Sequence, residues 1–578
     1  MSVAKELAQK AVLLMESDRR ADAIQAIVRA AIQFPKDFWV QYVAGVIHLQ
    51  SGKAVDAEVY FSRALKLDPT FLTAKSGLGA SLVAQKKYKE GLVIANEICK
   101  DDPNAMDAFD LAMNCHVHLG DYESAAIAGQ RAHELAPTNE QVTQNFYATL
   151  RDFDPKRGAE FLQKILAGSP SRLLLRSLAP DTLYPDDLPE SEIAKIHNEV
   201  AELQKGLAIG YRPSVKQPSG KLRLGFLSAD FRAHSVSFFL LPLLKNIDQS
   251  KFSLFGYSLN VHVDSFTKQY RSLMTFRPHS VSSTGALYDL IIGDEIDVLI
   301  DLAGLTGGGR PDVITTRPAP VIISMIGYAS SVGSPCIDYR IVDSITDPSD
   351  SEDWGPEQRY RMDPCFLTYD PIYPLPNIVR RQSGSRLTFG SLNNDVKITS
   401  TTVRHWSAML QAFPESELLL KSLRSGAPVV QNRLKAEFDK YGLGDRIRFL
   451  PYAKSPDAHI QTYNQIDIAL DTFPYNGTTT TMESLMMGVP VVSVSGTVHR
   501  SRVTQSLLAA IGHPEWAVDT SEELVEVVRK MVDDLEGLRA SRQSLRKQVQ
   551  DSVIFDHAGY ARRFEAMIED IVSKRWTQ

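Results

Sequence analysis

The sequence predicts a fold of class α plus α/β, in which an array of helical repeats precedes two α/β halves. Three observations carry this prediction. Prolines recur at a constant interval in the first quarter of the chain. Beyond Lys221, short apolar runs alternate with helical patterns in two successive sets, separated by a proline-rich passage at 370–377. The chain of 578 residues is also long enough for several domains.

The repeat array is indicated by spacing. Four prolines lie 34 residues apart, at Pro35, Pro69, Pro103 and Pro137. Twelve positions before each proline stands a small residue: Ala23, Ala57, Gly91 and Ala125. Five positions before each proline stands an apolar residue: Ala30, Ala64, Ile98 and Ala132. Small residues let paired helices approach closely, and the proline ends the second helix. This pattern is typical of tetratricopeptide repeats, which present a groove to extended peptides.

We therefore predict a tetratricopeptide-repeat superhelix over residues 1–150 that captures protein partners. Residues 151–220 alternate helical stretches with proline-containing turns, which predicts a helical bridge. An ordinary helical bundle with chance spacing would require three equal intervals by accident.

The two α/β halves are predicted at 221–378 and 379–578. Each contains five short apolar runs that are typical of buried strands: LRLGFLS, FSLFGYSL, IDVLIDLAG, APVIISMIG and YRIVD, then LTFGSLN, SELLLKSL, RIRFLPYA, IDIALDTF and VPVVSVSG. Alternating strands and helices predict parallel sheets, so we expect two Rossmann-like domains that face a cleft. The last helical pattern, from His557 to Arg575, is expected to cross back to the first half. Neither GxGxxG nor a Walker A motif follows these strands, so hydride transfer and P-loop chemistry gain no support.

Composition excludes other classes of protein. Lys and Arg total 63 against 69 Asp and Glu, a net charge of −6, whereas binding to nucleic-acid phosphates requires a concentrated basic face. No apolar stretch approaches the roughly 20 residues of a membrane span, and no secretory leader is visible. The four cysteines lie far apart and never form CxxC. We therefore expect a cytoplasmic protein without nucleic-acid or membrane partners.

The most informative segment is DTFPYNGTTTTMES, at 471–484. A strand ends near Asp471, a turn follows, and a run of threonines opens a helix. Amide groups at a helix start are unsatisfied and carry the positive end of the helix dipole. The sequence thus predicts a diphosphate cradle, with Glu483 as an acceptor for a ribose diol, made from Asn476, Gly477, Thr478, Thr479 and Thr480. The alternative is that the threonines only cap the helix and that Glu483 is a solvated acid.

Further candidates follow other predicted strands. In FGSLNNDVKIT, Asn394 and Lys397 lie beyond a strand, where open α/β sheets bind ligands and a lysine can neutralise a leaving phosphate. DAHIQTY contributes His459, which can stack on a nucleobase. DFRAHSVSFF places His234 after the opening strand of the first half. Taken singly, a lysine after a strand is more often a surface residue, and His459 is more often structural.

In the first half, RPAPVIISMIGY runs through a predicted buried strand. It begins at Arg317 and ends at Gly327 and Tyr328. We assign these three residues to the side of the cleft that receives the sugar and the acceptor.

Taken together, these segments resemble glycosyltransferase family 41, the protein O-GlcNAc transferases and SPINDLY-type proteins. The likeness spans the repeats, the bridge and both halves, through DFxxHSVSxF, RPAPV, FGSxNNxxKIT and DTFPYxGTTTTxESLxMGVP. These motifs are closer to the SPINDLY branch than to the animal O-GlcNAc transferases. The resemblance implies a GT-B fold, inversion at the anomeric carbon, a nucleotide-sugar donor, and no metal or other cofactor.

By the same resemblance, Lys397 contacts the donor diphosphate and Asn394 lies close to it, where the family often has Gln. Thr479 and Thr480 match the phosphate-binding threonine pair. His459 matches the residue that packs on the base, Glu483 matches the ribose-binding acid, and His234 matches the histidine beside the sugar. Thr478 and Thr462 depart from the animal branch, which has His and Arg there, and 329–333 replaces its Pro-Gly-Thr-Ser-Gly loop.

The resemblance predicts transfer of a sugar, GlcNAc from UDP-GlcNAc, to Ser or Thr hydroxyls of proteins bound by the repeats. Lys397 and the helix start would stabilise the leaving diphosphate, and His234 would be either the general base or a group that orients the sugar. GDP-fucose, the donor of the SPINDLY branch in plants, and other hexose donors stay open, as does homo-oligomerisation.

Two other classes of function compete. The repeats argue against a GT-B enzyme for small glycans or lipids, which need no peptide groove. Retention of Lys397, His234 and the threonine run argues against a non-catalytic repeat scaffold.

Overall fold

A computed structural model describes residues 3–17, 19–168, 171–205, 220–278, 283–453 and 455–577. The chain forms two compact units, Met1–Ala167 and Gly168–Gln578. None of the helices in the described ranges is both long and apolar enough to cross a membrane.

The first unit is an array of paired antiparallel helices, as predicted. Its helices are α1 Val3–Glu16, α2 Arg20–Gln33, α3 Phe38–Gln50, α4 Ala54–Leu67, α5 Leu72–Ala84, α6 Tyr88–Asp101, α7 Met106–Leu119, α8 Tyr122–Leu135, α9 Glu140–Phe153 and α10 Pro155–Ala167. The second helix of each repeat ends two residues before its proline. The repeat period therefore reports helix pairing directly.

Close helix packing in this unit depends on small residues in register. Ala57 and Ala64 of α4 are fully buried, and Phe61 lies between them with 1% of its surface exposed. Gly45 and Gly77, from the preceding and following helices, both face the Phe61 ring, because a Cβ atom on either glycine would lie within 2.7 Å of it. One aromatic side chain thus fills the space that two glycines leave.

The helical array extends past the predicted boundary at residue 150. Helix α9 runs through that position, and α10 packs against it within the same compact unit. Helices α9 and α10 pack closely at Gly158, where a Cβ atom would lie 2.9 Å from the Arg151 backbone. The bridge therefore begins after Ala167, with α11 Arg172–Leu178, the 3₁₀ helix η1 Ala179–Leu183 and α12 Glu190–Lys205. The rest of the predicted bridge, 206–219, lies outside the described residues.

The second unit contains two parallel sheets. The first has the order β3-β2-β1-β4-β5-β6-β7 and the second the order β10-β9-β8-β11-β12-β13. The strands are β1 Leu222–Ser228, β2 Phe252–Ser258, β3 Thr275–Arg277, β4 Val298–Asp301, β5 Val321–Ser324, β6 Tyr339–Val342, β7 Gln358–Arg361, β8 Thr388–Ser391, β9 Glu417–Lys421, β10 Ile447–Leu450, β11 Ile468–Leu470, β12 Val491–Val494 and β13 Ala517–Val518.

Each strand order reverses direction beside its first strand, so each half has a switch point, between β1 and β4 and between β8 and β11. Ligands of open α/β sheets bind at the carboxyl ends of the strands at such points. The helices of the two halves are α13 Ser235–Asn246, α14 Ser265–Leu273, α15 Thr284–Gly293, α16 Pro311–Ile314, η2 Asp395–Lys397, α17 Ser400–Ala412, α18 Pro428–Asp439, η3 Gly444–Arg446, α19 Pro456–Gln461, η4 Thr462–Gln465, α20 Thr479–Met486, η5 His499–Ser501, α21 Val503–Ala510, η6 Pro514–Trp516, α22 Ser521–Val532, α23 Leu535–Ala540, α24 Arg542–Gln550 and α25 His557–Thr577.

All ten strands expected from apolar runs are present, which confirms two Rossmann-like halves. The sequence did not reveal β3, β7 and β13. These three strands lie at sheet edges, and none of their residues is fully buried. Edge strands need no continuous apolar run because they have a neighbour on one side only.

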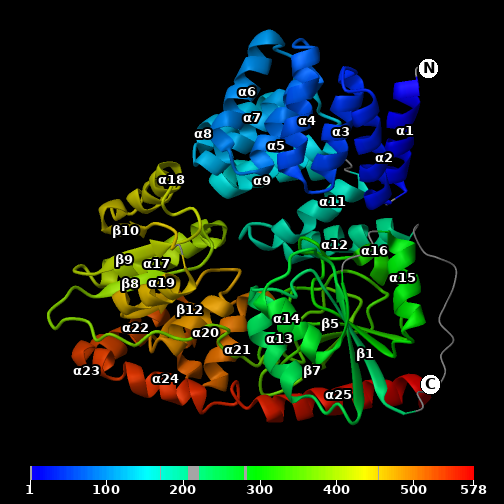
Figure 1. The fold of residues 1–578 in the computed structure, drawn as a ribbon. Helices are drawn as coiled ribbons and strands as arrows, with labels where there is room; N and C mark the ends of the chain where they lie inside the picture. The colour runs from blue at the N-terminus through cyan, green and yellow to red at the C-terminus, as the bar shows by residue number, and fades with distance from the viewer. Residues whose placement is uncertain are drawn as a thin grey trace. The chain divides into compact units, whose positions relative to one another are not determined.

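The C-terminal helix α25 crosses back to the first half, as predicted, and Figure 1 shows it (red) running along that half beside α13. The Tyr560 hydroxyl donates to the Phe366 carbonyl at 2.7 Å, and Glu565 accepts from the Asp248 amide at 2.8 Å.

The bridge also contacts both halves: His197 of α12 lies 3.1 Å from the Tyr328 hydroxyl, and Arg500 donates to the Leu183 carbonyl at 3.1 Å. The two halves are therefore tied together at several places.

We expect Phe61→Ala to lower the free energy of unfolding of the helical array by about 3–5 kcal/mol, because it removes a buried ring and leaves a cavity between two glycines. Hydrogen exchange of the α3–α5 amides in the full chain measures this loss. Val59→Ala, on the same helix but 45% exposed, is the control and should change stability by less than about 0.5 kcal/mol. Equal hydrogen-exchange protection in both variants would show that Phe61 does not stabilise the packing of α3–α5.

Candidate active site

A buried carboxylate joins the loops at the switch point of the second sheet. Asp471 follows β11, and its Oδ1 accepts from the amides of Gly477 at 2.7 Å and Thr472 at 2.8 Å. The same oxygen accepts from Nδ2 of Asn393, which follows β8, at 3.3 Å. Burial raises the pKa of Asp471, and hydrogen bonds from Thr504, Gly477 and Thr472 oppose that rise. One carboxylate thus fixes both loops that carry the predicted phosphate ligands.

Lys397 lies at this junction, at the end of η2. Its Nζ donates to the Asn476 carbonyl at 2.9 Å and lies 4.0 Å from the centroid of the Tyr475 ring. Burial lowers the pKa of Lys397 to about 8, and the negative charge of Asp471 opposes that shift. The side chain is therefore mainly charged at neutral pH. None of the described carboxylates forms a direct ion pair with it, so its charge is available to an anion.

The amino end of α20 begins three residues after Asn476, whose carbonyl accepts from Lys397. The first-turn amides of a helix have no acceptor within the helix and carry the positive end of its dipole. Position 477 has no room for a side chain, because a Cβ atom there would lie 2.5 Å from Oγ1 of Thr480. Glycine therefore leaves the helix start open to an anion. The Thr480 hydroxyl donates to Asn393 at 2.9 Å, whereas the half-buried Thr478 and Thr479 precede it at the helix start. The arrangement can bind an anion through backbone amides.

Two predicted asparagines have different surroundings. Asn476 is 1% exposed, and its side-chain amide donates to the Thr472 carbonyl at 2.9 Å. The part of Asn476 that contacts Lys397 is its main-chain carbonyl. Asn394 is exposed, and its Oδ1 accepts from Arg424 at 2.9 Å. Asn476 therefore shapes the loop, and Asn394 is the one of the two that can meet a ligand with its side chain.

His459 and Glu483, the predicted base and ribose contacts, lie together. The His459 Nε2 atom is 3.2 Å from Oε2 of Glu483, and its Nδ1 atom is 2.6 Å from Nζ of Lys421. Burial lowers the pKa of Lys421 to about 8. Sequence reasoning missed Lys421, although a lysine that ends the apolar run SELLLK at the carboxyl end of a strand was a visible signal.

In the first half, His234 caps the amino end of α13. Its Nδ1 atom lies 3.4 Å from the Val236 amide and 3.5 Å from Oδ2 of Asp230. Burial lowers the pKa of His234 below its ordinary 6.5; Asp230 opposes this shift and Arg232 adds to it. The imidazole is therefore neutral at pH 7 and can accept a proton. Asp230 was missed, although it stands four residues before the histidine.

Arg317 is not near the carboxyl edge of its sheet. It precedes the amino end of β5 and donates to Asp338 at 2.6 Å and to the carbonyls of Cys336 at 2.9 Å and Pro320 at 3.1 Å. These bonds occupy its guanidinium, so the placement gives no support to a contact with sugar or acceptor. The arginine instead organises the start of a strand.

Gly327 and Tyr328 do follow the carboxyl end of β5. Gly327 passes so close to the preceding loop that a Cβ atom would lie 1.8 Å from the Leu302 carbonyl oxygen. The Tyr328 hydroxyl is buried against His197 of the bridge, and burial raises its pKa well above the ordinary value. These two residues fix the loop at this edge, and the Tyr328 hydroxyl is already bound.

A small cavity lies where the two halves and the bridge meet. The loop after β5, the segment after β6, the loop after β12 and Glu190 of α12 line it. Across it, Asp347 of the first half accepts from His499 of the second at 2.6 Å and from Arg340 at 2.9 Å. The contact joins the segment after β6 of the first sheet to the segment after β12 of the second.

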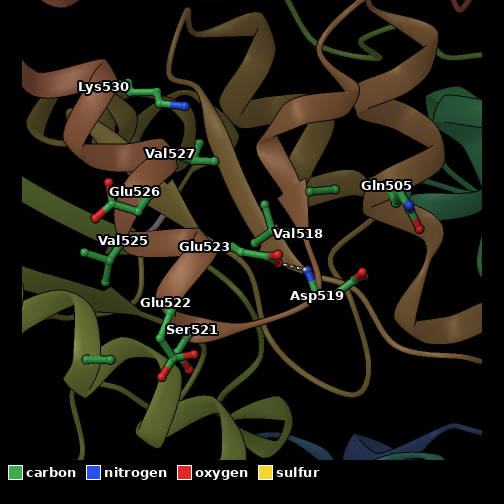
Figure 2. Close-up of a pocket in the computed structure, with 12 residues that line it drawn as sticks. Gln505, Val518, Asp519, Ser521, Glu522, Glu523, Val525, Glu526, Val527 and Lys530 are labelled. Carbon is green, nitrogen blue, oxygen red and sulfur yellow. Dashed lines mark hydrogen bonds between the residues drawn. The ribbon is translucent and has the colours of Figure 1, made fainter.

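A larger hollow lies elsewhere, along the edge strand β13 and helix α22 (Figure 2). Figure 2 shows Glu523 directed at the Asp519 amide, which donates to it at 3.1 Å. The described residues that line this hollow include none of the predicted site residues, and its acidic lining would repel a diphosphate. The hollow therefore gives no support to a diphosphate site there, and the candidate site stays at the switch points.

Comparison with known proteins identifies the family of this chain. The model of glycosyl transferase family 41 matches residues 192–383 and 383–564, so the chain belongs to that family. It is 33% identical over 380 residues to the "Probable UDP-N-acetylglucosamine--peptide N-acetylglucosaminyltransferase SPINDLY" of Arabidopsis thaliana, covering 62% of this chain and 40% of that protein. The protein of the same name from Solanum lycopersicum is 34% identical over 371 residues, covering 61% and 39%. The matches thus span about two fifths of these relatives.

A solved structure of a Thermobaculum terrenum O-GlcNAc transferase mutant matches 99% of this chain and 98% of its own, with a TM-score of 0.64 and 24% identity. At that identity the match shows the fold. Helical repeats followed by a GT-B pair of domains are therefore the architecture of this chain, as the sequence predicted.

We expect Gly477→Ala to weaken binding of a nucleoside diphosphate by about tenfold or more, because the added methyl group displaces the Thr480 hydroxyl and crowds the helix start. Isothermal titration calorimetry of the full chain measures the loss. Gly285→Ala is the control, since a Cβ atom at Gly285 meets nothing within 4 Å. Unchanged affinity in the Gly477 variant would place the diphosphate elsewhere.

Proposed function

We propose that this chain is a protein O-glycosyltransferase that moves a sugar from a nucleoside diphosphate to a Ser or Thr hydroxyl, with inversion at the anomeric carbon. The observation that carries the proposal is the placement of Lys397 beside the amino end of α20, at the switch point of the second sheet. Family membership and the names of the relatives support the same reaction class.

The reaction forms a bond between the acceptor oxygen and the anomeric carbon, and it breaks the bond between that carbon and the diphosphate. Negative charge develops on the leaving oxygen. The Lys397 ammonium and the first-turn amides of α20 are preorganised to stabilise it, and stabilisation of this kind is often the largest contribution to catalysis. Because these groups supply positive charge at the leaving group, we propose that the transfer needs no metal ion.

The acceptor hydroxyl must lose its proton during the attack. His234 has the required neutral form, and Asp230 can stabilise the imidazolium that results. His234 would serve equally well by orienting the sugar, in which case the proton leaves through another group. Inversion follows if the hydroxyl attacks opposite to the diphosphate.

We propose UDP-GlcNAc as the donor, since the names of the matched relatives specify it. GDP-fucose, which the resemblance gives as the donor of the SPINDLY branch in plants, is the second candidate. Identity is higher to the SPINDLY proteins, at 32–34%, than to a Caenorhabditis elegans UDP-N-acetylglucosamine--peptide N-acetylglucosaminyltransferase, at 23%. The base side also differs from the animal pattern: Thr462 is buried, and its hydroxyl donates to the Ala458 carbonyl at 3.2 Å.

We propose that the helical array supplies the surface on which protein acceptors bind, because tetratricopeptide-type arrays present extended grooves. A small glycan or lipid acceptor would leave this unit without a function. The bound acceptor would place its hydroxyl near His234.

The direct test is a transfer assay with UDP-GlcNAc and GDP-fucose, a mixture of intact proteins as acceptors, and excess EDTA. Mass spectrometry should find one hexosamine added at Ser or Thr with UDP-GlcNAc. Addition of deoxyhexose with GDP-fucose would select the second donor. Loss of transfer in EDTA, with recovery in Mg²⁺, would contradict metal independence, and no transfer from any sugar nucleotide would leave the scaffold alternative.

We expect Lys397→Ala to lower kcat by about 10²–10³ while the fold is kept, because the variant loses a preorganised charge at the leaving group. Initial rates at saturating donor measure this. Lys440→Ala, which removes an exposed lysine from the same half, is the control and should keep normal turnover. Near-normal kcat in the Lys397 variant would remove this residue from the mechanism.

The dependence of kcat/KM on pH should be bell-shaped. His234 must be neutral, so activity falls at pH values below its lowered pKa, which lies under 6.5. Lys397 must be protonated, so activity also falls as pH rises through about 8, where Lys421 loses its proton as well. A profile that stays level well above pH 8 would show that neither lysine acts as a cation.

A further inference from the structure

We propose that Lys421 is a positioning residue, which holds His459 as the neutral tautomer that carries its proton on Nε2 and directs that proton at Glu483. The inference rests on the proposed function only for its consequence on donor binding. The tautomer itself is a property of the free protein.

The position of Lys421 makes this contact possible. It is the last residue of β9, the strand beside β8, and its side chain is 4% exposed. Among the described residues, Nζ of Lys421 makes one hydrogen bond, the 2.6 Å contact with Nδ1 of His459. A lysine buried this deeply with an imidazole as its partner has a specific task, because an exposed position would cost less free energy.

Both ends of the contact specify the same tautomer. An ammonium has three donors and no acceptor, so Nδ1 of His459 must offer a lone pair. At the other end, the Glu483 carboxylate can only accept, so the Nε2 atom 3.2 Å away must carry the proton. The pKa of Lys421, about 8, keeps the ammonium form dominant at neutral pH.

Tyr463 is a second donor within hydrogen-bond distance of Glu483. Its buried hydroxyl lies 3.1 Å from the Thr480 carbonyl and 3.3 Å from Oε2 of Glu483. A hydroxyl has one proton, so it cannot donate fully to both acceptors at once, and the Thr480 carbonyl is the nearer of the two. Lys421, through His459, therefore helps to orient the carboxylate by its Oε2 atom. None of the described residues donates a hydrogen bond to Oε1 of Glu483, so that oxygen can accept from a ligand hydroxyl.

On the proposed function, Lys421 sets the orientation of the two groups that meet the nucleoside, and it does not contact the departing diphosphate. Its removal should therefore act mainly on donor binding. We expect Lys421→Met to raise the KM for the donor by about tenfold and to change kcat by less than about threefold. Lys421→Arg keeps a charged donor at this place and should recover most of the affinity.

The decisive readout is the ¹⁵N spectrum of the imidazoles in deuterated full-chain protein labelled at histidine, at neutral pH and without nucleotide. His459→Asn identifies the signals of His459 by their loss. We expect a protonated Nε2 and an unprotonated Nδ1 in the wild type, a different protonation pattern in Lys421→Met, and the wild-type pattern in the control Lys440→Met. The wild-type spectrum decides the tautomer even if Lys421→Met fails to fold.

A wild-type His459 protonated at Nδ1, or at both nitrogens, would overturn the proposal, and so would an unchanged pattern in a folded Lys421→Met variant. If the tautomer is as expected but no sugar nucleotide binds, the proposed function fails and the positioning contact stands. If the nucleotide binds and Lys421→Met leaves KM unchanged, the contact has no role in donor binding and that part of the proposal is wrong.

Discussion

The buried carboxylate of Asp471 is the interaction on which the rest of the site depends. Its hydrogen bonds to Gly477, Thr472 and Asn393 join the loop after β11 to the loop after β8. Without them, neither the start of α20 nor Lys397 would have a fixed place. Loss of a partner would also leave buried polar groups unsatisfied, at a cost of about 1–3 kcal/mol each. Stability and anion binding therefore share one set of contacts.

The second constraint is the closeness of the two halves. Helix α25 returns the end of the chain to the first half, the bridge binds both halves, and Asp347 and His499 meet between them. These contacts tie the two halves together, and the proposed transfer requires this, since it assigns His234 of one half and Lys397 of the other to the same reaction.

Much of this architecture could be predicted from the sequence because it is periodic. A 34-residue proline interval fixes the helical pairs, and buried central strands require apolar runs. The edge strands β3, β7 and β13 lacked that signal, and the array continued into α10 without a further proline in register. Motifs located Lys397, Gly477 and His459. They did not reveal that the side chains of Arg317 and Asn476 are occupied by structural bonds, or that Lys421 partners His459, because such pairings are set by tertiary packing.

The most direct test of the central claim is a crystal structure of the full chain with UDP bound in the presence of EDTA. The diphosphate should lie within hydrogen-bond distance of Lys397 Nζ and of the amides at the start of α20, with the ribose against Glu483. A diphosphate held elsewhere, for example against the hollow beside β13, or one that binds only through an added metal ion, would contradict the account.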